Sequence, residues 1–313
     1  MSIYLLAGQS GRTNLALIQA WRRLGVDATM LMPAQARWRV QRADTVVARL
    51  DVTASLDGVE PGLRELRRLE RRGVRVFNTA AALRSMHDKL ESAEVLSRHG
   101  VPNPRTARVT EQDRTLPIKL PVVVKPRYGS WGRDVVRCTT SSEWAQCLDD
   151  IGNRPWFRRH GALVQALVEP LGYDLRLVVA RGEVVGAVER VASSTEWRTN
   201  VALGAVRRRV MPPPEAVAAA LAAAAAIGGD FVGVDLLPHR SGGFVVLELN
   251  GAVDFTADYS LDGRDIFARV ARLLAREESD GFTHVPQALP VVDAIGTPAT
   301  CAGDQIVGIE HAG

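Results

Sequence analysis

The apolar segments of this chain change their arrangement near residue 100, and this change limits the folds that the chain can adopt. Up to about residue 80, short apolar runs such as "IYLLAG" and "VRVFN" alternate with helical patterns such as "NLALIQAWRRLG". This alternation predicts βαβ units and therefore a small parallel sheet with covering helices. From about residue 115 to 275, strands and hairpins are interleaved with helices. We therefore expect an α/β domain followed by an α+β body.

The first domain boundary is expected at the segment "MHDKLESAEVLSRHGVPNPRTARV". From Asp88 this segment predicts an amphipathic helix, which Gly100 ends, and Pro102 and Pro104 begin an extended connection. After the helix "GRDIFARVARLLAREE", residues 279–313 are rich in Pro, Ala, Gly and Thr and show no period, so we expect a loosely ordered tail. The alanine-rich run "EAVAAALAAAAAIGG" follows three prolines and predicts a packed helix.

Composition excludes several classes of protein. A net charge of +4 comes from 39 basic residues dispersed among 35 acidic ones, which argues against a nucleic-acid-binding stripe. No run approaches the eighteen or so apolar residues of a membrane helix, and the chain opens on a strand without a basic leader, so we expect no membrane partner and a cytoplasmic protein. Cys138, Cys147 and Cys301 fit neither a disulfide framework nor a metal site.

Three polar residues on one predicted hairpin, "GVDLLPHRSGGFVVLELN", indicate a metal site. Glu248 and Asn250 leave the same face of their strand because one residue separates them. If Ser241–Gly242 is the turn, Asp235 lies directly opposite Glu248, and like charges in that arrangement destabilise a sheet unless a positive group lies between them. Such oxygen ligands suit Mg²⁺ with a substrate phosphate. The alternative is a set of acidic strand ends in water.

The stretch "VVVKPRYGSWGRDVV" predicts a strand, a glycine loop and a returning strand. Only three of the 39 basic residues are lysines, namely Lys89, Lys119 and Lys125. Lys125 ends the buried strand as a compact point charge suited to a phosphate oxygen, and Gly129 and Gly132 allow the next backbone N–H groups to turn toward that phosphate. An ordinary hairpin is the alternative.

A cluster of polar residues lies between these two motifs along the chain. Asp174 and Arg176 share a strand face, and Arg190 falls on the strand that returns from the "ARGEVV" hairpin, whose turn is expected at Arg181–Gly182. Their guanidinium groups can hold a substrate carboxylate or stabilise a transferring phosphoryl group. The alternative is a solvated sheet face coated with arginine.

The first βα turn, Gly8 to Asn14, opens a helix and can place N–H groups toward an anion. It lacks the ending of a P-loop and the spacing of a dinucleotide fingerprint. The turn is therefore either structural or, through Arg12 and Asn14, a place for a substrate carboxylate. A dinucleotide-dependent oxidoreductase would leave the metal trio unexplained.

Seven short motifs, in this order, resemble those of the ATP-grasp superfamily and most closely its RimK-like and LysX-like carboxylate–amine ligases. They are "HDK", "VVVKPRYGSWG", "LVQALVE", "GYDLR", "EWRTN", "GVDLL" and "LELN". The resemblance covers about residues 1 to 275. It implies an α/β and α+β ATP-grasp fold with a Rossmann-like N-terminal domain at residues 1–85, a central subdomain with the glycine loop at 86–165, and a C-terminal subdomain with the metal site at 166–278.

The resemblance also implies roles for single residues. Lys89 and Lys125 would contact ATP phosphates, and the loop Gly129, Ser130, Trp131, Gly132 would fold over them, with Trp131 either shielding the reaction from water or packing. Gln165 and Ala166 would form the adenine hinge, and Asp174 would contact the ribose. The phosphate and reaction-centre segment would be Arg198, Thr199 and Asn200. The magnesium ligands would be Asp235, Glu248 and Asn250.

The activity implied is transfer of the ATP γ-phosphoryl group to a carboxylate, followed by attack of an amine on the acyl phosphate, with Arg198, Arg176 and Arg190 stabilising charge. ATP and Mg²⁺ would be required, with two metal ions expected and Mn²⁺ as the alternative to Mg²⁺. The amine would come from an amino acid such as glutamate, and the carboxylate from a peptide, carrier protein or metabolite. A homodimer or homotetramer is expected by analogy. Gly204-Ala205 and "GAVDFTADYS" depart from the family pattern beside the acceptor site, and a catalytically silent ATP-binding regulator is the alternative function.

Overall fold

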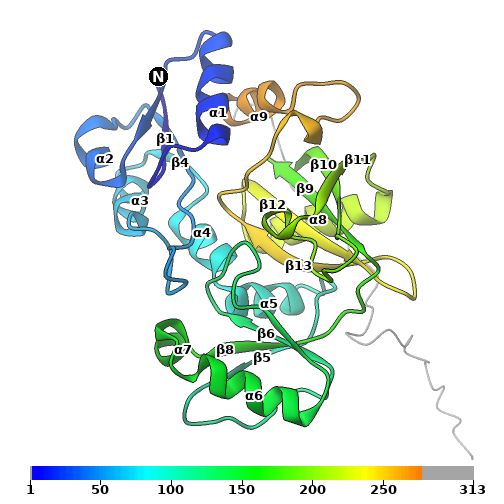
Figure 1. Cartoon of the computed structure of the whole chain (residues 1–313). Helices are drawn as coiled ribbons and strands as arrows, with labels where there is room; N and C mark the ends of the chain where they lie inside the picture. Colours follow the sequence, from blue (N-terminus) through cyan, green and yellow to red (C-terminus); the bar gives the residue numbers. More distant parts are fainter. Residues whose placement is uncertain (1, 277–313) are drawn as a thin grey trace, which may run out of the picture.

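The computed structural model describes residues 2–276, and the expected tail at 279–313 lies outside this range. Figure 1 shows a parallel sheet at the N-terminus and two further sheets. Within the described part of the chain, no helix is long and apolar enough to cross a membrane.

The N-terminal sheet contains four parallel strands in the order β2-β1-β3-β4. Strands β1 (Ile3–Leu6), β2 (Ala28–Leu31), β3 (Thr45–Ala48) and β4 (Arg75–Phe77) alternate with helices α1 (Arg12–Arg23), α2 (Pro33–Arg39), α3 (Leu63–Arg71) and α4 (Ala80–His87). Leu5 packs with α1 and the C-terminal helix α9 (Ile266–Ala275), whereas Leu6 packs with α2 and α3. The strands are apolar on both faces because helices cover both, which confirms the βαβ prediction.

The central part begins with the predicted helix and contains a four-stranded sheet in the order β5-β8-β6-β7. Its elements are α5 (Lys89–Arg98), β5 (Thr106–Val109), β6 (Val122–Pro126), β7 (Val136–Cys138), α6 (Ser141–Gly152), α7 (Pro155–His160) and β8 (Ala162–Ala166). Asp88 caps α5, and Gly100 follows it with φ +67°, as the helix signals predicted. Strands β6 and β7 pair antiparallel, so the predicted hairpin shape around the glycine loop is confirmed.

The C-terminal sheet contains five antiparallel strands in the order β11-β10-β9-β12-β13. Its strands are β9 (Tyr173–Ala180), β10 (Glu183–Val191), β11 (Val206–Arg209), β12 (Phe231–Pro238) and β13 (Phe244–Asn250). The 3₁₀ helix η1 (Val201–Leu203) and α8 (Pro214–Ala226) lie between strands in the sequence, and the 3₁₀ helix η2 (Ala257–Tyr259) precedes α9. The alanine run forms α8, as predicted, with a proline at its first turn.

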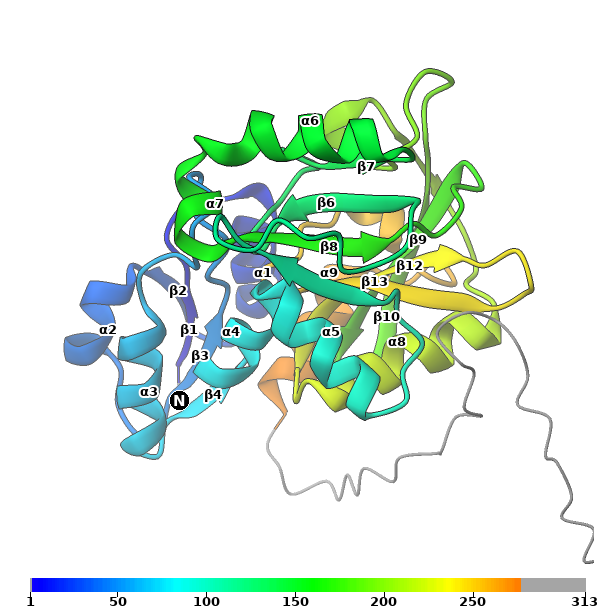
Figure 2. The same cartoon turned by 90° about the horizontal axis from the view of Figure 1, so that it is seen from below.

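The two faces of the C-terminal sheet differ in composition. Leu175, Leu177 and Leu236 pack with the alanines of α8 in one apolar cluster. Because side chains alternate along a strand, residues such as Asp174, Arg176 and Asp235 project from the opposite face. That face meets the central sheet, as Figure 2 shows for β12 and β13 beside β6 and β8.

The two predicted hairpin turns had different outcomes. Arg181–Gly182 is a two-residue turn, with Ala180 paired to Glu183, as predicted. The Ser241–Gly242 turn was wrong, because Pro238 pairs with Phe244 and the loop spans residues 239–243. Two backbone hydrogen bonds, from His239 to Gly243 and from Gly242 to His239, close this longer loop. A bulge between Asp235 and Leu236 then shifts the register by one residue, so Asp235 still lies opposite Glu248.

Candidate active site

A cleft with an empty volume of about 950 Å³ lies between the central and C-terminal sheets. Most of the predicted site residues line it, although Arg176 and Asn250, both within the described residues, are not among its lining residues. Those that line it are Lys89, Lys125, Gly129, Ser130, Gly132, Gln165, Ala166, Asp174, Arg190, Arg198, Thr199, Asn200, Asp235 and Glu248. The fold therefore brings together residues that are up to 159 positions apart in the chain.

Lys125 is a buried cation on the wall that the central sheet forms. Its Nζ donates to Oε1 of Gln165 at 2.7 Å, and the side chain amide of Gln165 donates in turn to Thr106. Burial, together with the nearby charge of Lys89, lowers the pKa of Lys125 to about 8. A neutral amide does not compensate a buried ammonium group, so Lys125 is suited to an anionic ligand.

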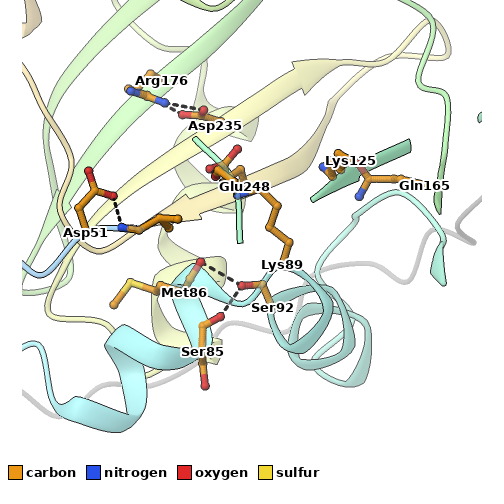
Figure 3. Close-up of polar contacts among 12 residues, drawn as sticks. Asp51, Ser85, Met86, Lys89, Ser92, Lys125, Gln165, Arg176, Asp235 and Glu248 are labelled. Atoms are coloured by element: carbon orange, nitrogen blue, oxygen red, sulfur yellow. Dashed lines mark hydrogen bonds and ion pairs between the residues drawn. The ribbon is translucent and has the colours of Figure 1, made fainter. Parts of the chain in front are cut away.

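Lys89 joins the glycine loop to the acidic strand β13. Its Nζ donates to the Gly129 carbonyl oxygen at 2.7 Å and to Oε1 of Glu248 at 2.9 Å. Figure 3 shows Lys89 extending from α5 toward Glu248, with Lys125 beside Gln165 to the right of Glu248. The first residue of a helix thus places one ammonium group between the two motifs that the sequence singled out.

Asp88 organises the residues before the glycine loop, a role that the sequence reasoning missed. It is 1% exposed and accepts hydrogen bonds from Nε and Nη2 of Arg127 at 2.7 and 2.6 Å and from the Tyr128 hydroxyl at 2.9 Å. Burial and the Asp88 carboxylate raise the pKa of Tyr128 to about 12, so its hydroxyl keeps the donated proton. An aspartate that caps a helix immediately before a rare lysine was the available signal.

The glycine loop contacts the segment that contains Arg198. Nη1 of Arg198 donates to the carbonyl oxygens of Gly132 and Val135 at 2.9 and 3.3 Å, and a Cβ at Gly132 would lie 2.7 Å from Oδ1 of Asn200. Glycine is therefore favoured at position 132, where φ is also +70°. Trp131 lines the cleft and is 47% exposed, so it is not part of the core.

Charged residues from four strands form what we call the charged row: Asp174, Arg176, Arg190, Asp235 and Glu248. Asp235 lies opposite both Arg176 and Glu248, and Arg190 lies opposite Asp174. Arg176 binds both oxygens of Asp235 at 2.6 and 2.7 Å, and Arg190 binds both oxygens of Asp174 and reaches Asp235 at 2.9 Å. Burial alone would raise the pKa of Asp235, but the two guanidinium groups outweigh it and lower the pKa.

The donor set of the predicted metal trio fits Mg²⁺. Asp235 and Glu248 are opposite one another, and Asn250 follows two residues later on the same strand face, so two carboxylates and an amide are available. Nδ2 of Asn250 is buried without a hydrogen-bond partner. No group of three His, Cys, Asp or Glu residues within residues 2–276 offers another metal site. The cations on Asp235 and Glu248 occupy oxygens that a metal ion would share.

Other predicted residues already have partners. The backbone N–H of Ala166 donates to the Arg105 carbonyl oxygen, and Asp174 accepts from Thr199 as well as from Arg190. Both carboxylate oxygens of Glu196 accept from Arg198. The adenine, ribose and reaction-centre roles of these residues stay predictions.

The N-terminal turn is tied to the loop after Asn250. Arg12 is exposed, whereas Asn14 is buried and its Oδ1 accepts from Nε of Arg49 at 2.6 Å. Arg49 also donates to the Val253 carbonyl oxygen at 2.8 Å, and burial lowers its pKa to about 10. These contacts support the structural interpretation of the turn, and Arg49 was not found from the sequence because its partners are 35 and 204 residues away.

Comparison with known protein families matches this chain to one family. Residues 86–274 match the RimK-like ATP-grasp domain family. The glutamate–LysW ligase ArgX of Sulfolobus acidocaldarius is 29% identical over 197 residues, which are 60% of this chain and 68% of the relative. A probable α-L-glutamate ligase of Serratia proteamaculans is 29% identical over 249 residues, 78% of this chain and 80% of the relative.

The fold also has close neighbours among solved structures. The crystal structure of a RimK domain ATP-grasp protein from Sphaerobacter thermophilus aligns with a TM-score of 0.64 at 21% identity. The alignment covers 88% of this chain and 100% of that structure. At this identity the match bears on the fold, and it covers more of the chain than the family match at residues 86–274.

Proposed function

This chain belongs to the RimK-like ATP-grasp family and is an ATP-dependent carboxylate–amine ligase, and we propose that it joins the amine of an amino acid such as glutamate to a carboxylate on a peptide, carrier protein or metabolite. One observation carries the proposal. Lys125 on the central sheet and the Asp235–Glu248 pair on the C-terminal sheet line opposite walls of one cleft. Cations on one wall suit the phosphates of ATP, and carboxylates on the other suit its metal ion.

In the first step, an oxygen of the substrate carboxylate attacks the γ-phosphorus of ATP, the bond to the bridging oxygen breaks and ADP leaves. Lys89 and Lys125 hold the phosphates, and backbone N–H groups of the glycine loop cover them. Phosphoryl transfer of this kind depends on positioning and on neutralisation of charge, so it needs no protein nucleophile. The Arg198 contacts to Gly132 and Val135 support a coupling between the loop and the reaction centre.

In the second step, the amine attacks the acyl carbon, loses a proton and displaces phosphate, which leaves with the oxygen that came from the carboxylate. Arg198, with Arg176 and Arg190, stabilises the negative charge on the tetrahedral intermediate. Arg176 and Arg190 are fixed by their carboxylate partners, so they are oriented before substrate arrives.

Asp235, Glu248 and Asn250 would hold Mg²⁺. When bound, the ion supplies positive charge to the phosphate oxygens. We propose that two metal ions bind and that Mn²⁺ can replace Mg²⁺. We also propose that Gln165, Ala166 and Asp174 contact the nucleotide. By analogy with relatives, the proposal includes a homodimer or homotetramer.

The proposal is tested by screening pooled amino acids and pooled carboxylates with ATP and Mg²⁺ for release of ADP and phosphate. Release should require both pools and should be lost in Glu248→Gln, which keeps the size of the side chain but removes its charge. If the wild type binds ATP but no pool stimulates release, the chain is a nucleotide-binding regulator and not a ligase.

A further inference from the structure

Strand β11, at the free edge of the C-terminal sheet, extends the charged row by one arginine (Figure 1). Arg207 is paired directly with Arg190, and Arg208 with Glu189. Directly opposite residues of an antiparallel pair project from the same face, and neighbours along a strand project from opposite faces. Arg207 therefore shares the face of Arg190 and Asp174, whereas Arg208 projects from the other face.

Arg207 differs from the other arginines around the charged row because no carboxylate binds it. The guanidinium groups of Arg176 and Arg190 bind the carboxylates of Asp235 and Asp174, respectively. The guanidinium group of Arg198 binds Glu196. Nε of Arg207 is buried and has no hydrogen-bond partner, and no ion pair is made by Arg207 within residues 2–276. A buried donor without a partner costs free energy, as does a like charge directly opposite.

The charges around the row balance without Arg207. Arg176, Arg190 and Lys89 are bound to Asp235, Asp174 and Glu248, so each of these cations has a carboxylate. Lys125 and Arg207 bind no carboxylate within residues 2–276, and they lie in different places. Lys125 is on the central sheet, where the proposed function puts the ATP phosphates, and Arg207 is on the strand farthest from β13.

The surroundings of Arg207 indicate which anion it takes. Its neighbour Arg190 and the row partner Asp174 are joined by Thr199 to the segment that is proposed to hold the reacting groups. Arg207 is not among the residues that line the cleft, whereas its directly opposite neighbour Arg190 is, so an anion on Arg207 would lie at the edge of the cleft. In the proposed reaction, one carboxylate is phosphorylated. A second anion must then be held next to the reaction centre without being phosphorylated, and this anion is the carboxylate of the amine-bearing substrate.

We propose that Arg207 binds the α-carboxylate of the amino acid whose amine attacks the acyl phosphate. The inference rests on the proposed function and adds the residue that selects its amine donor, so amines without the carboxylate are poor substrates. The planar guanidinium fork matches the two oxygens of a carboxylate, which lysine matches less well. The bound carboxylate supplies the partner that Nε lacks and separates Arg207 from Arg190.

The test compares wild type, Arg207→Gln, Arg207→Lys and the matched control Arg208→Gln from the same strand. ADP release is measured against the concentration of the amino acid that gives most release among the twenty, against its α-carboxamide, and against ATP. In Arg207→Gln we expect the KM for the amino acid to rise about 10- to 100-fold, the size expected for a lost charged hydrogen bond. The KM for ATP should stay within about twofold, and the preference for the acid over its carboxamide should disappear.

Arg207→Lys should fall between wild type and Arg207→Gln, and Arg208→Gln should match the wild type. Arg207→Gln should unfold at no lower temperature than wild type, because the change removes a like-charge pair; if it does not fold, Arg207→Lys carries the comparison. An unchanged KM for the amino acid, or a preserved preference over the carboxamide, overturns the assignment of Arg207 while the ligase activity stands. If no amino acid stimulates wild-type release, the proposed function fails and this inference with it.

Discussion

The two walls of the cleft hold their charges in different ways. On the wall formed by the C-terminal sheet, Arg176 and Arg190 bind Asp235 and Asp174 directly, so cations and carboxylates compensate one another. On the central wall, Lys125 is also buried, but its ammonium group donates to the neutral amide of Gln165 and not to a carboxylate. The difference indicates that Arg176 and Arg190 are compensated by carboxylates of the protein, whereas Lys125 carries a positive charge that a ligand must compensate.

Removing a cation from the paired wall should have the largest effect. Arg190→Met leaves Asp174 and Asp235 buried with less positive charge, and we expect the free energy of unfolding to fall by about 3–5 kcal/mol. Denaturant unfolding of the variant measures this loss. Arg209→Gln, at an exposed arginine 3.5 Å from Asp258, is the control and should change stability by less than about 0.5 kcal/mol. A loss below about 1 kcal/mol in Arg190→Met would show that the row is not compensated as described.

Removing the cation from the other wall should have the opposite sign in stability. Lys125→Met eliminates a buried charge that lacks a carboxylate, so unfolding should need as much denaturant as in wild type or more. ATP affinity, measured by calorimetry, should fall about 10- to 100-fold because a charged hydrogen bond to phosphate is lost. Unchanged nucleotide affinity would remove Lys125 from the phosphate site.

The same lysine should make ATP binding depend on pH. Its pKa is about 8 in the folded protein, below the ordinary value of 10.5. Below pH 8 the lysine is protonated in both the folded and the unfolded protein, and burial of its charge opposes folding. Between pH 8 and 10.5 only the folded protein loses the proton. The free-energy cost of burying the charge therefore decreases as pH rises, and the protein becomes more stable. ATP needs the protonated form, so affinity should weaken by about tenfold per pH unit above pH 8. Lys125→Met should lack this slope.

The smallest effect concerns the tip of the glycine loop. Trp131 is exposed in the cleft, with the Arg133 guanidinium 5.2 Å from its ring. If it shields the reaction from water, ATP should quench tryptophan fluorescence in wild type, and the quench should be absent in Trp131→Phe. A quench of equal size in both proteins would assign the signal to another tryptophan.

The sequence predicted which faces and elements carry the site, because strand alternation and helix signals are local. It placed Asp235 opposite Glu248, although from a turn that was wrong, and the compensating bulge has no local signal. It placed Arg190 and Asp174 on paired strands, but it did not predict that Arg176 and Arg190 bind the carboxylates.

Those contacts could not be predicted because they depend on how side chains pack across strands. Arg176 and Asp235 are 59 residues apart, and the Asp88 contacts with Arg127 and Tyr128 join a helix cap to a loop 39 and 40 residues later. Hydrophobic periodicity reports which side of an element is buried, and it does not report which buried charges meet.

Formation of an acyl phosphate can be tested by following one oxygen atom of the carboxylate substrate. The carboxylate substrate found in the screen is labelled with ¹⁸O and incubated with the enzyme, ATP, Mg²⁺ and the amino acid, and the released phosphate is analysed by mass spectrometry. Transfer of the γ-phosphoryl group to the carboxylate predicts one labelled oxygen in each phosphate released with ADP. Label in AMP, or phosphate without label, would contradict an acyl phosphate formed in this cleft.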